Sequence, residues 1–144
     1  MFDHDFESVI KNCASVERKE QFGTWITEDM IKAYLELQKR GYAHCVETYE
    51  QGELVGGLYG ISLGKVFFGE SMFHLKPDAS KVALYYLVTH LKNWEFEIID
   101  AQQETNHLKS LGARALTRSK FLELLKIAIA KDSHIGNWRL KVED

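Results

Sequence analysis

The chain has 144 residues and a mass of 16.6 kDa, a size typical of one folded domain. Hydrophobic residues make up 45% of the chain and aromatic residues 12%, which excludes intrinsic disorder, and a single proline, Pro77, excludes Pro-rich linkers and collagen-like repeats. The net charge of −3 lacks the basic excess of a dedicated nucleic-acid binder. We therefore expect one soluble domain over 1–144, with no hint of a nucleic-acid partner in its composition.

Cysteine usage and hydropathy predict the cellular compartment. Cys13 and Cys45 are far apart and form no CxxC pair, so neither a disulfide framework nor a zinc site is expected. The histidines show no i,i+4 pair typical of zinc ligands. No apolar stretch approaches the ~20 residues of a membrane span, and the acidic start is unlike a signal or transit peptide. These features predict a cytoplasmic protein without a metal or membrane contact.

Two helices are expected at the start of the chain. The first has an apolar face made of Phe6, Val9, Ile10 and Ala14. The second is expected to begin after Thr27, a suitable N-cap, and to end before Gly41, a suitable residue after a helix. Its core-facing residues at helical spacing are Met30, Ile31, Tyr34, Leu35 and Gln38.

A three-stranded antiparallel meander is expected next. Its strands are 42–49, 54–61 and 66–70, joined by turns at Gln51-Gly52 and Leu63-Gly64. The middle strand carries Gly56, Gly57 and Gly60, and glycine inside a strand often marks a bulge or a close approach. Residues 71–78 are expected to form a loop.

The pattern of the second half of the sequence predicts further helices and strands in alternation. A helix capped by Asp78 or Ser80 is expected to run to about Lys92. Its expected core face is Val82, Ala83, Tyr86, Leu87, His90 and Leu91. A strand over 96–100, a short helix from Thr105 or Asn106 to Gly112, a short strand over 113–116 and a helix over 121–129 follow. This order predicts an α/β fold with a mixed, mainly antiparallel sheet flanked by helices.

The order of elements resembles the GNAT acyltransferase fold, starting after that fold's first strand. The "LGA" at 111–113 resembles the GNAT ending in which a helix is followed by "GF". GNAT enzymes hold the pyrophosphate of acyl-coenzyme A in a Gly-rich loop, whereas the corresponding FHLKPDASKVA has no glycine. A coenzyme A donor is therefore disfavoured. Without the first strand, we expect an open sheet edge.

Four stretches carry a more specific resemblance. They are GTWIT (23–27), GELVGGLYG (52–60) with VFFGESMF (66–73), DASKVAL (78–84), and IDAQ (99–102) with HLKSLGAR (107–114). Together they resemble the leucyl/phenylalanyl-tRNA–protein transferase family over about 5–121. The resemblance implies a GNAT-like domain, without a cofactor, that moves Leu, Phe or Met from aminoacyl-tRNA to proteins with N-terminal Arg or Lys. The product would be a destabilising N-terminus of the bacterial N-degron pathway.

The family also implies differences from this chain. Its members carry a tryptophan-containing segment before the residue aligned with Met1, and that segment helps to hold the tRNA end. Ala101 stands where a cysteine is common in the family.

The catalytic residues implied by the resemblance are Asp100, Gln102 and Thr105. Aminolysis of an ester needs a neutral amine that loses a proton as the bond forms. Asp100 and Gln102 are two residues apart on a strand, so their side chains face the same side. In the family interpretation Gln102 contacts the amine and Asp100 supports it, while Thr105 is at the position that orients the glutamine. The alternative is an aspartate that caps a helix or forms a salt bridge.

The resemblance also implies substrate-binding residues. Glu70 would pair with the cationic first residue of the acceptor, and the alternative is a solvent-exposed glutamate at a strand end. Trp25 would stack on the terminal adenine of tRNA, and the alternative is a hydrophobic plug. The slot for the donor side chain, which we call the donor slot, would be lined by Leu58, Phe67, Gly69, Met72, Leu84, Leu87, Leu91 and Ile99. The alternative for these residues is plain core.

Charge is polarised along the chain. Residues 1–30 hold seven acidic and three basic residues, whereas 109–131 hold six basic residues and one acid, Glu123. The basic set could follow the acceptor stem of tRNA through its phosphates, and the alternative is an ordinary solvated helix face. Its members are Lys109, Arg114, Arg118, Lys120, Lys126 and Lys131. Two other functions are kept as alternatives: a non-catalytic module that binds N-terminal Arg or Lys, and a GNAT enzyme with another acyl donor.

Overall fold

A computed structural model describes residues 1–20, 26–100 and 117–138, and for 16–20 it describes the backbone alone. The elements in this range are α1 (Phe6–Glu20), α2 (Glu28–Lys39), β1 (Ala43–Glu50), β2 (Glu53–Leu63), β3 (Val66–His74), α3 (Ala79–Asn93), β4 (Ile98–Asp100) and α5 (Arg118–Ile129). The helix expected from Thr105 or Asn106 and the strand expected over 113–116 lie outside the described residues.

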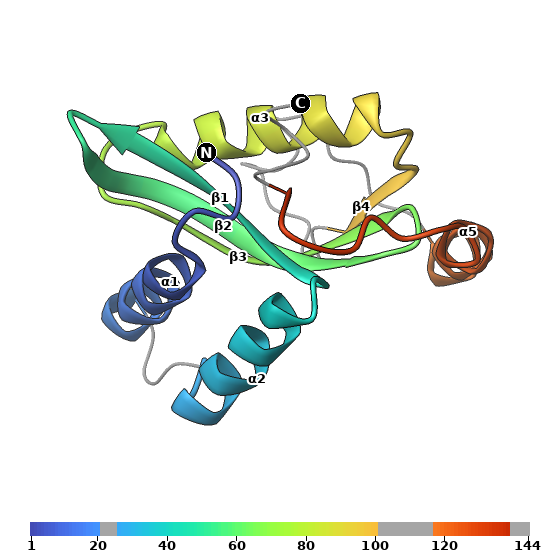
Figure 1. The fold of residues 1–144 in the computed structure, drawn as a ribbon, viewed down its shortest axis with the longest axis horizontal. Helices are drawn as coiled ribbons and strands as arrows, with labels where there is room; N and C mark the ends of the chain where they lie inside the picture. The colour runs from blue at the N-terminus through green and yellow to red at the C-terminus, as the bar shows by residue number, and fades with distance from the viewer. Residues whose placement is uncertain (21–25, 101–116, 139–144) are drawn as a thin grey trace.

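The sheet has the order β1-β2-β3-β4 and is mixed. The pairs β1–β2 and β2–β3 are antiparallel, and β3–β4 is parallel. The helix α3 makes the crossover between the two parallel strands, and it covers one face of the sheet, while α1 and α2 cover the other (Figure 1). The predicted α/β class, with a mainly antiparallel sheet between helices, is confirmed.

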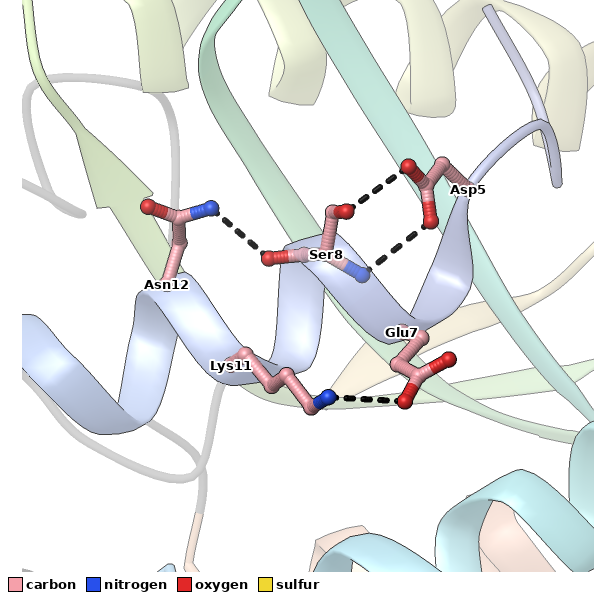
Figure 2. A network of polar contacts seen from close by, with 5 residues as sticks. All are labelled: Asp5, Glu7, Ser8, Lys11 and Asn12. Carbon is pink, nitrogen blue, oxygen red and sulfur yellow. Dashed lines mark hydrogen bonds and ion pairs between the residues drawn. The ribbon is translucent and has the colours of Figure 1, made fainter.

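Local hydrogen bonds explain where α1 begins. The carboxylate of Asp5 accepts from the backbone N–H of Ser8 at 3.2 Å and from its hydroxyl at 2.7 Å, which satisfies the first turn (Figure 2). One turn on, Lys11 pairs with Glu7 at 2.7 Å. The predicted apolar face is confirmed, because its four residues are at most 5% exposed.

The ends of α2 follow the predicted capping residues. Thr27 accepts from the N–H of Met30 at 3.2 Å. After the last turn, Gly41 has φ +87° and donates to Gln38 O at 3.0 Å, while Tyr42 donates to Leu37 O at 2.9 Å. This pair of bonds is a Schellman motif, which needs a residue with positive φ and therefore favours glycine.

Three predicted boundaries or faces are wrong. The residues 71–74 are not a loop but the end of β3, because they continue the antiparallel pairing with β2 and Phe73 is buried. On α3, Val82 and Tyr86 are 42% and 53% exposed, since the helix presents its Ala79–Ala83–Leu87–Leu91 stripe to the sheet. The last helix begins at Arg118, three residues earlier than expected, because the Thr117 hydroxyl accepts from Lys120 N–H.

The core has two clusters, one on each face of the sheet. The cluster under α1 and α2 is made of Phe6, Val9, Ile10, Cys13, Ala14, Ile26, Ala43, Cys45, Tyr59 and Phe73. The cluster under α3, which we call the α3-side cluster, is made of Phe2, Val46, Leu58, Phe67, Ala83, Leu87, Leu91 and Trp138.

The edge of the sheet at β1 is partly covered. Glu47 N–H donates to Met1 O at 2.8 Å, and Asp3 N–H donates to Cys45 O at 3.0 Å. Phe2 forms an antiparallel bridge with Val46. The expectation of an open edge is therefore wrong over Cys45–Glu47, where the first residues of the chain pair with β1.

Candidate functional site

A β-bulge places Glu70 at the centre of the sheet. On β2, Tyr59 pairs with Ser71 and the next residue, Gly60, pairs with Gly69, so Glu70 is the extra residue of the bulge. Gly60 has no room for a side chain, because a Cβ there would lie 2.2 Å from the Phe68 carbonyl oxygen. A bulge bends a strand and redirects a side chain. The predicted acceptor-binding residue is therefore at the one irregular point of this strand pair.

Tyr34 of α2 approaches Glu70 of the sheet from the helix layer that covers it. Its hydroxyl lies near enough to the Glu70 carboxylate to donate a hydrogen bond to it. Burial, and then the charge of Glu70 and this bond, raise the pKa of Tyr34 to about 12, so the hydroxyl stays a neutral donor at physiological pH. The Tyr34 ring packs edge-on against the fully buried Tyr59, with 5.3 Å between centroids. Tyr34 is thus packed in place beside Glu70.

Asp100 lies on the same face of the sheet as Glu70. In the parallel pair, Phe68 is opposite Asp100 and Phe67 is opposite Ile99. Side chains alternate along a strand, so Asp100 shares the face of Phe68, which is opposite to that of the α3-side residue Phe67. The bulge interrupts this alternation at Glu70, and the nearness of Tyr34 places Glu70 on the α2 side. Two half-buried carboxylates thus lie on the α2 side of neighbouring strands, near the point where the described part of β4 ends and β3 continues.

The residues predicted for the donor slot fall into two groups. Leu58, Phe67, Leu87 and Leu91 belong to the α3-side cluster at 1–3% exposure, and Met72 and Leu84 pack against it. Gly69 and Ile99 lie at the β3–β4 pair: a Cβ at Gly69 would be 3.3 Å from the Asp100 carbonyl oxygen, and Ile99 is 36% exposed. The structure brings six of the eight residues together on the α3 side of the sheet.

Several predicted site residues cannot be placed. Trp25, Gln102, Thr105, Lys109 and Arg114 lie outside the described residues.

Comparison with known proteins identifies the family. A sequence model described as "Leucyl/phenylalanyl-tRNA protein transferase" matches residues 1–126. The chain belongs to the leucyl/phenylalanyl-tRNA–protein transferase family. The resemblance inferred from the four sequence stretches is therefore confirmed.

Curated members of the leucyl/phenylalanyl-tRNA–protein transferase family are about half identical to the chain over the aligned residues. The protein of that name from Hydrogenovibrio crunogenus is 52% identical over 141 residues, which are 98% of this chain and 55% of the relative. The one from Maridesulfovibrio salexigens is 56% identical over 138 residues, which are 95% of this chain and 58% of the relative. The chain thus spans little more than half the length of the curated relatives it matches.

A solved structure confirms the fold class of this transferase-family chain. The crystal structure of aminoglycoside antibiotic 6'-N-acetyltransferase AAC(6')-IG from Acinetobacter haemolyticus superposes with a TM-score of 0.52. The two proteins are 15% identical, and the superposed region covers 76% of this chain and 87% of the acetyltransferase. At this identity the likeness concerns the fold alone. It agrees with the predicted GNAT-like acyltransferase fold.

Sequence reasoning missed three residues of this family member's interior. Tyr34 was expected to be core, yet its hydroxyl contacts Glu70. His44 and Trp138 stack at 3.7 Å between ring centroids, although 94 positions separate them in the sequence. No local pattern signals such contacts. A lone tryptophan following a polar stretch was the one available hint for Trp138.

One open cavity lies away from the predicted site. It has a volume of about 630 Å³ and lies between α1 and α2, and its lining includes the apolar Ile31 and Leu35 and the charged Glu7, Lys11, Glu28 and Lys32. In the described ranges, no group of three or more potential ligands could hold a metal ion, and no helix is long and apolar enough to cross a membrane.

Proposed function

We propose that this chain is an aminoacyltransferase acting in the cytoplasm. It moves leucine, phenylalanine or methionine from aminoacyl-tRNA to the α-amine of proteins whose first residue is arginine or lysine. The product is an N-degron that marks the protein for degradation. Family membership supports this reaction, since the relatives named above are leucyl/phenylalanyl-tRNA–protein transferases.

The single observation that carries the acceptor part of the proposal is the Tyr34–Glu70 contact on the face that Asp100 shares. A glutamate at this position can pair with a guanidinium or ammonium group. Charge-assisted hydrogen bonds are about twice as strong as neutral ones. Glu70 therefore binds the first side chain of the acceptor and places its α-amine beside Asp100.

The chemical step is attack of the α-amine on the ester carbon of the charged tRNA. The amine loses a proton as the new amide bond forms, and the 3′-terminal ribose leaves with its hydroxyl. Gln102 contacts the amine through its side-chain oxygen, Asp100 stabilises the positive charge that develops, and Thr105 orients Gln102. Because no step needs redox or phosphoryl chemistry, the reaction runs without a cofactor.

The donor is bound by its side chain and by its nucleic acid. The donor slot is apolar, and flexible side chains in it, such as Met72, repack easily, so several donor amino acids fit. Such a slot discriminates between donor side chains by only ~1–3 kcal/mol per methylene. Trp25 stacks on the terminal adenine. Arg118, Lys120 and Lys126 are exposed on α5 and contact phosphates of the acceptor stem, whereas Lys131 is paired with Glu97.

The decisive test is transfer of labelled leucine from charged tRNA to a peptide that starts with Arg. A peptide identical except for an N-terminal Ala serves as control. We expect transfer to the first peptide alone, and a loss of at least a hundredfold in the Asp100→Ala, Gln102→Ala double variant. Full transfer by that variant would refute the assigned mechanism.

The same experiment separates the alternative functions. A non-catalytic module would transfer no leucine. In calorimetry it would still bind the Arg-starting peptide, and the Glu70→Gln variant would lose this binding. A GNAT enzyme with another acyl donor would bind acetyl-coenzyme A, which we expect this chain not to do.

A further inference from the structure

The segment Ser133–Trp138, which we call the C-terminal strap, runs from α5 back between α3 and the sheet (Figure 1). Its route is fixed at intervals by polar contacts. The Ser133 hydroxyl accepts from the N–H of Gly64 at 2.7 Å, and Gly136 N–H donates to Gly41 O at 3.2 Å. The strap therefore enters the layer that holds the residues assigned to the donor slot.

Trp138 ends the strap inside that layer. Its side chain is fully buried, and its ring centroid is 5.9 Å from that of Phe67. Leu58, Leu87 and Leu91 belong to the same cluster at 1–3% exposure. Side chains this covered have almost no surface left for a substrate. A donor side chain can contact them only if another group leaves, and the bulkiest candidate is the indole of Trp138.

Polar contacts hold Trp138 in place, and its indole N–H donates to the His134 carbonyl oxygen at 2.9 Å. The Asp3 carboxylate oxygen Oδ2 accepts the backbone N–H of Trp138 at 2.8 Å and lies 2.8 Å from Nδ1 of His44. The His44 ring stacks on the indole with an interplanar angle of 9°. We call Asp3, His44 and Trp138 the latch. His44 belongs to β1 and Asp3 is bound to Cys45 of the same strand, so the latch opens by withdrawal of Trp138 from these two residues.

The latch also contains a destabilising feature. His44 Nε2 is buried and has no hydrogen-bond partner in the part of the chain that the structure describes. A buried polar atom without a partner destabilises the arrangement that buries it. The closed strap is thus opposed by an unsatisfied nitrogen, which favours a measurable population of the open state.

We propose that the C-terminal strap regulates the donor slot by filling it with Trp138, and that the aminoacyl side chain enters when the latch opens. This inference rests on the proposed function. If only a fraction of the molecules has an open strap, the apparent Kd for the donor equals the intrinsic Kd divided by that fraction. Variants that open the latch must therefore bind the donor more tightly than the wild type does.

The test uses a mimic of the donor, in which phenylalanine is joined by an amide to 3′-amino-3′-deoxyadenosine. Calorimetry measures its Kd for the wild type, Asp3→Asn and Trp138→Ala. Asp3→Asn keeps the shape of the side chain but replaces one acceptor oxygen by a donor group. We expect both variants to bind the mimic at least tenfold more tightly. Ile10→Ala, in the cluster on the other face, is the matched control and should leave the Kd unchanged.

A second measurement needs no variant. Hydrogen exchange of the backbone amides in the strap is followed in the wild type with and without the mimic. We expect faster exchange at Trp138 and Gly136 when the mimic is bound, because the latch is then open. A merely structural strap would keep its protection, and variants of the latch would weaken binding.

Two outcomes overturn the proposal. One is equal or weaker binding by Asp3→Asn together with unchanged exchange of the strap. The other is that neither the wild type nor any variant binds the mimic, since withdrawal of the indole would then have opened no slot. The proposed function fails in a different way: the mimic binds, but no leucine is transferred to the Arg-starting peptide.

Discussion

Tyr34 and Glu70 contribute to the proposed site through one hydrogen bond, and this bond can be removed without disturbing the packing. In Tyr34→Phe the ring still packs against Tyr59, but the Glu70 carboxylate is free to rotate. We expect the KM for the Arg-starting peptide to rise about threefold to tenfold, a loss of about 1 kcal/mol, while kcat changes less than about twofold. Steady-state transfer kinetics measure both constants.

The control for this prediction is Tyr49→Phe. Tyr49 is a partly buried tyrosine on β1, and its ring contacts His4. It pairs with Leu54, five residues along β2 from Tyr59, where the bulge at Glu70 lies. Its variant should keep the wild-type KM. A fall in kcat at constant KM in Tyr34→Phe would contradict a positioning role for Tyr34 in acceptor binding.

Glu47 makes the stability of the fold depend on pH. Its side chain is buried beside the Asp3 carboxylate, and it accepts a hydrogen bond from the Asp5 N–H. Burial is the main cause that raises the pKa of Glu47 to about 7. In the unfolded chain Glu47 has its ordinary pKa near 4.5. At a pH between 4.5 and 7, the folded state therefore binds a proton at Glu47 that the unfolded state has released.

The fold is expected to become less stable as the pH rises. The stabilisation is complete below about pH 4.5 and is lost as the pH rises through 7. We expect the free energy of unfolding in urea to fall by about 1–3 kcal/mol from pH 5 to pH 8, and Glu47→Gln to flatten most of this decline. The exposed Glu53→Gln is the control and should decline like the wild type. Identical slopes in all three proteins would exclude Glu47 as the source.

At the scale of elements, the β2–β3 bulge depends on a glycine. A Cβ at Gly60 would lie 2.2 Å from Phe68 O and 2.7 Å from the Phe67 ring, and the backbone oxygen cannot move aside cheaply. We expect Gly60→Ala to lower the free energy of unfolding by about 2–4 kcal/mol. Gly69→Ala, whose Cβ would meet one atom at 3.3 Å, should cost less than half as much. Urea unfolding measures the free energy of unfolding of both variants. Similar losses of this free energy in the two variants would show that the bulge tolerates a side chain at Gly60.

Elements set by local chemistry could be predicted from the sequence. Thr27 and Gly41 bound α2 as expected, because caps are made by residues next to the helix. The end of β3 could not be predicted, since Ser71–His74 extend by pairing with β2 and not by their own propensity. Likewise, Val82 and Tyr86 fit a helical core stripe, but the approach of Ala79 to Gly56 turns the helix and leaves them exposed.

The candidate site could be predicted in part, for the same reason. Glu70 and Asp100 were found through motif residues, and their common face follows from strand pairing that the order of elements predicts. Tyr34 and Trp138 reach their partners across layers of the fold, and such long-range contacts leave no periodic pattern in the sequence. They could be seen only once the layers were assembled.

At the scale of the whole molecule, the charge on α5 predicts how tRNA binds. Arg118, Lys120 and Lys126 are exposed. Replacing all three by Gln should weaken binding of charged tRNA and reduce the slope of log K against log salt by up to about 2–3, because each phosphate contact releases counterions. Binding of the donor mimic, which has no phosphate, should stay unchanged.

A control removes the same charge elsewhere. Lys32→Gln, Lys39→Gln and Arg40→Gln take three exposed positive charges from α2 and its end. If this triple variant lowers the salt slope as much as the α5 variant does, tRNA binding reflects net charge and not a surface on α5.

The hydrogen bond between Asp3 and Trp138 joins residues 135 positions apart. On a ribosome, Asp3 is made long before Trp138, so the layer under α3 cannot close until Trp138 has left the exit tunnel. Contacts of this sequence separation slow folding because a long loop must close first. The nascent chain thus carries an uncovered apolar sheet face until Trp138 emerges, and in this period we expect it to depend on chaperones more than a fold with local contacts would.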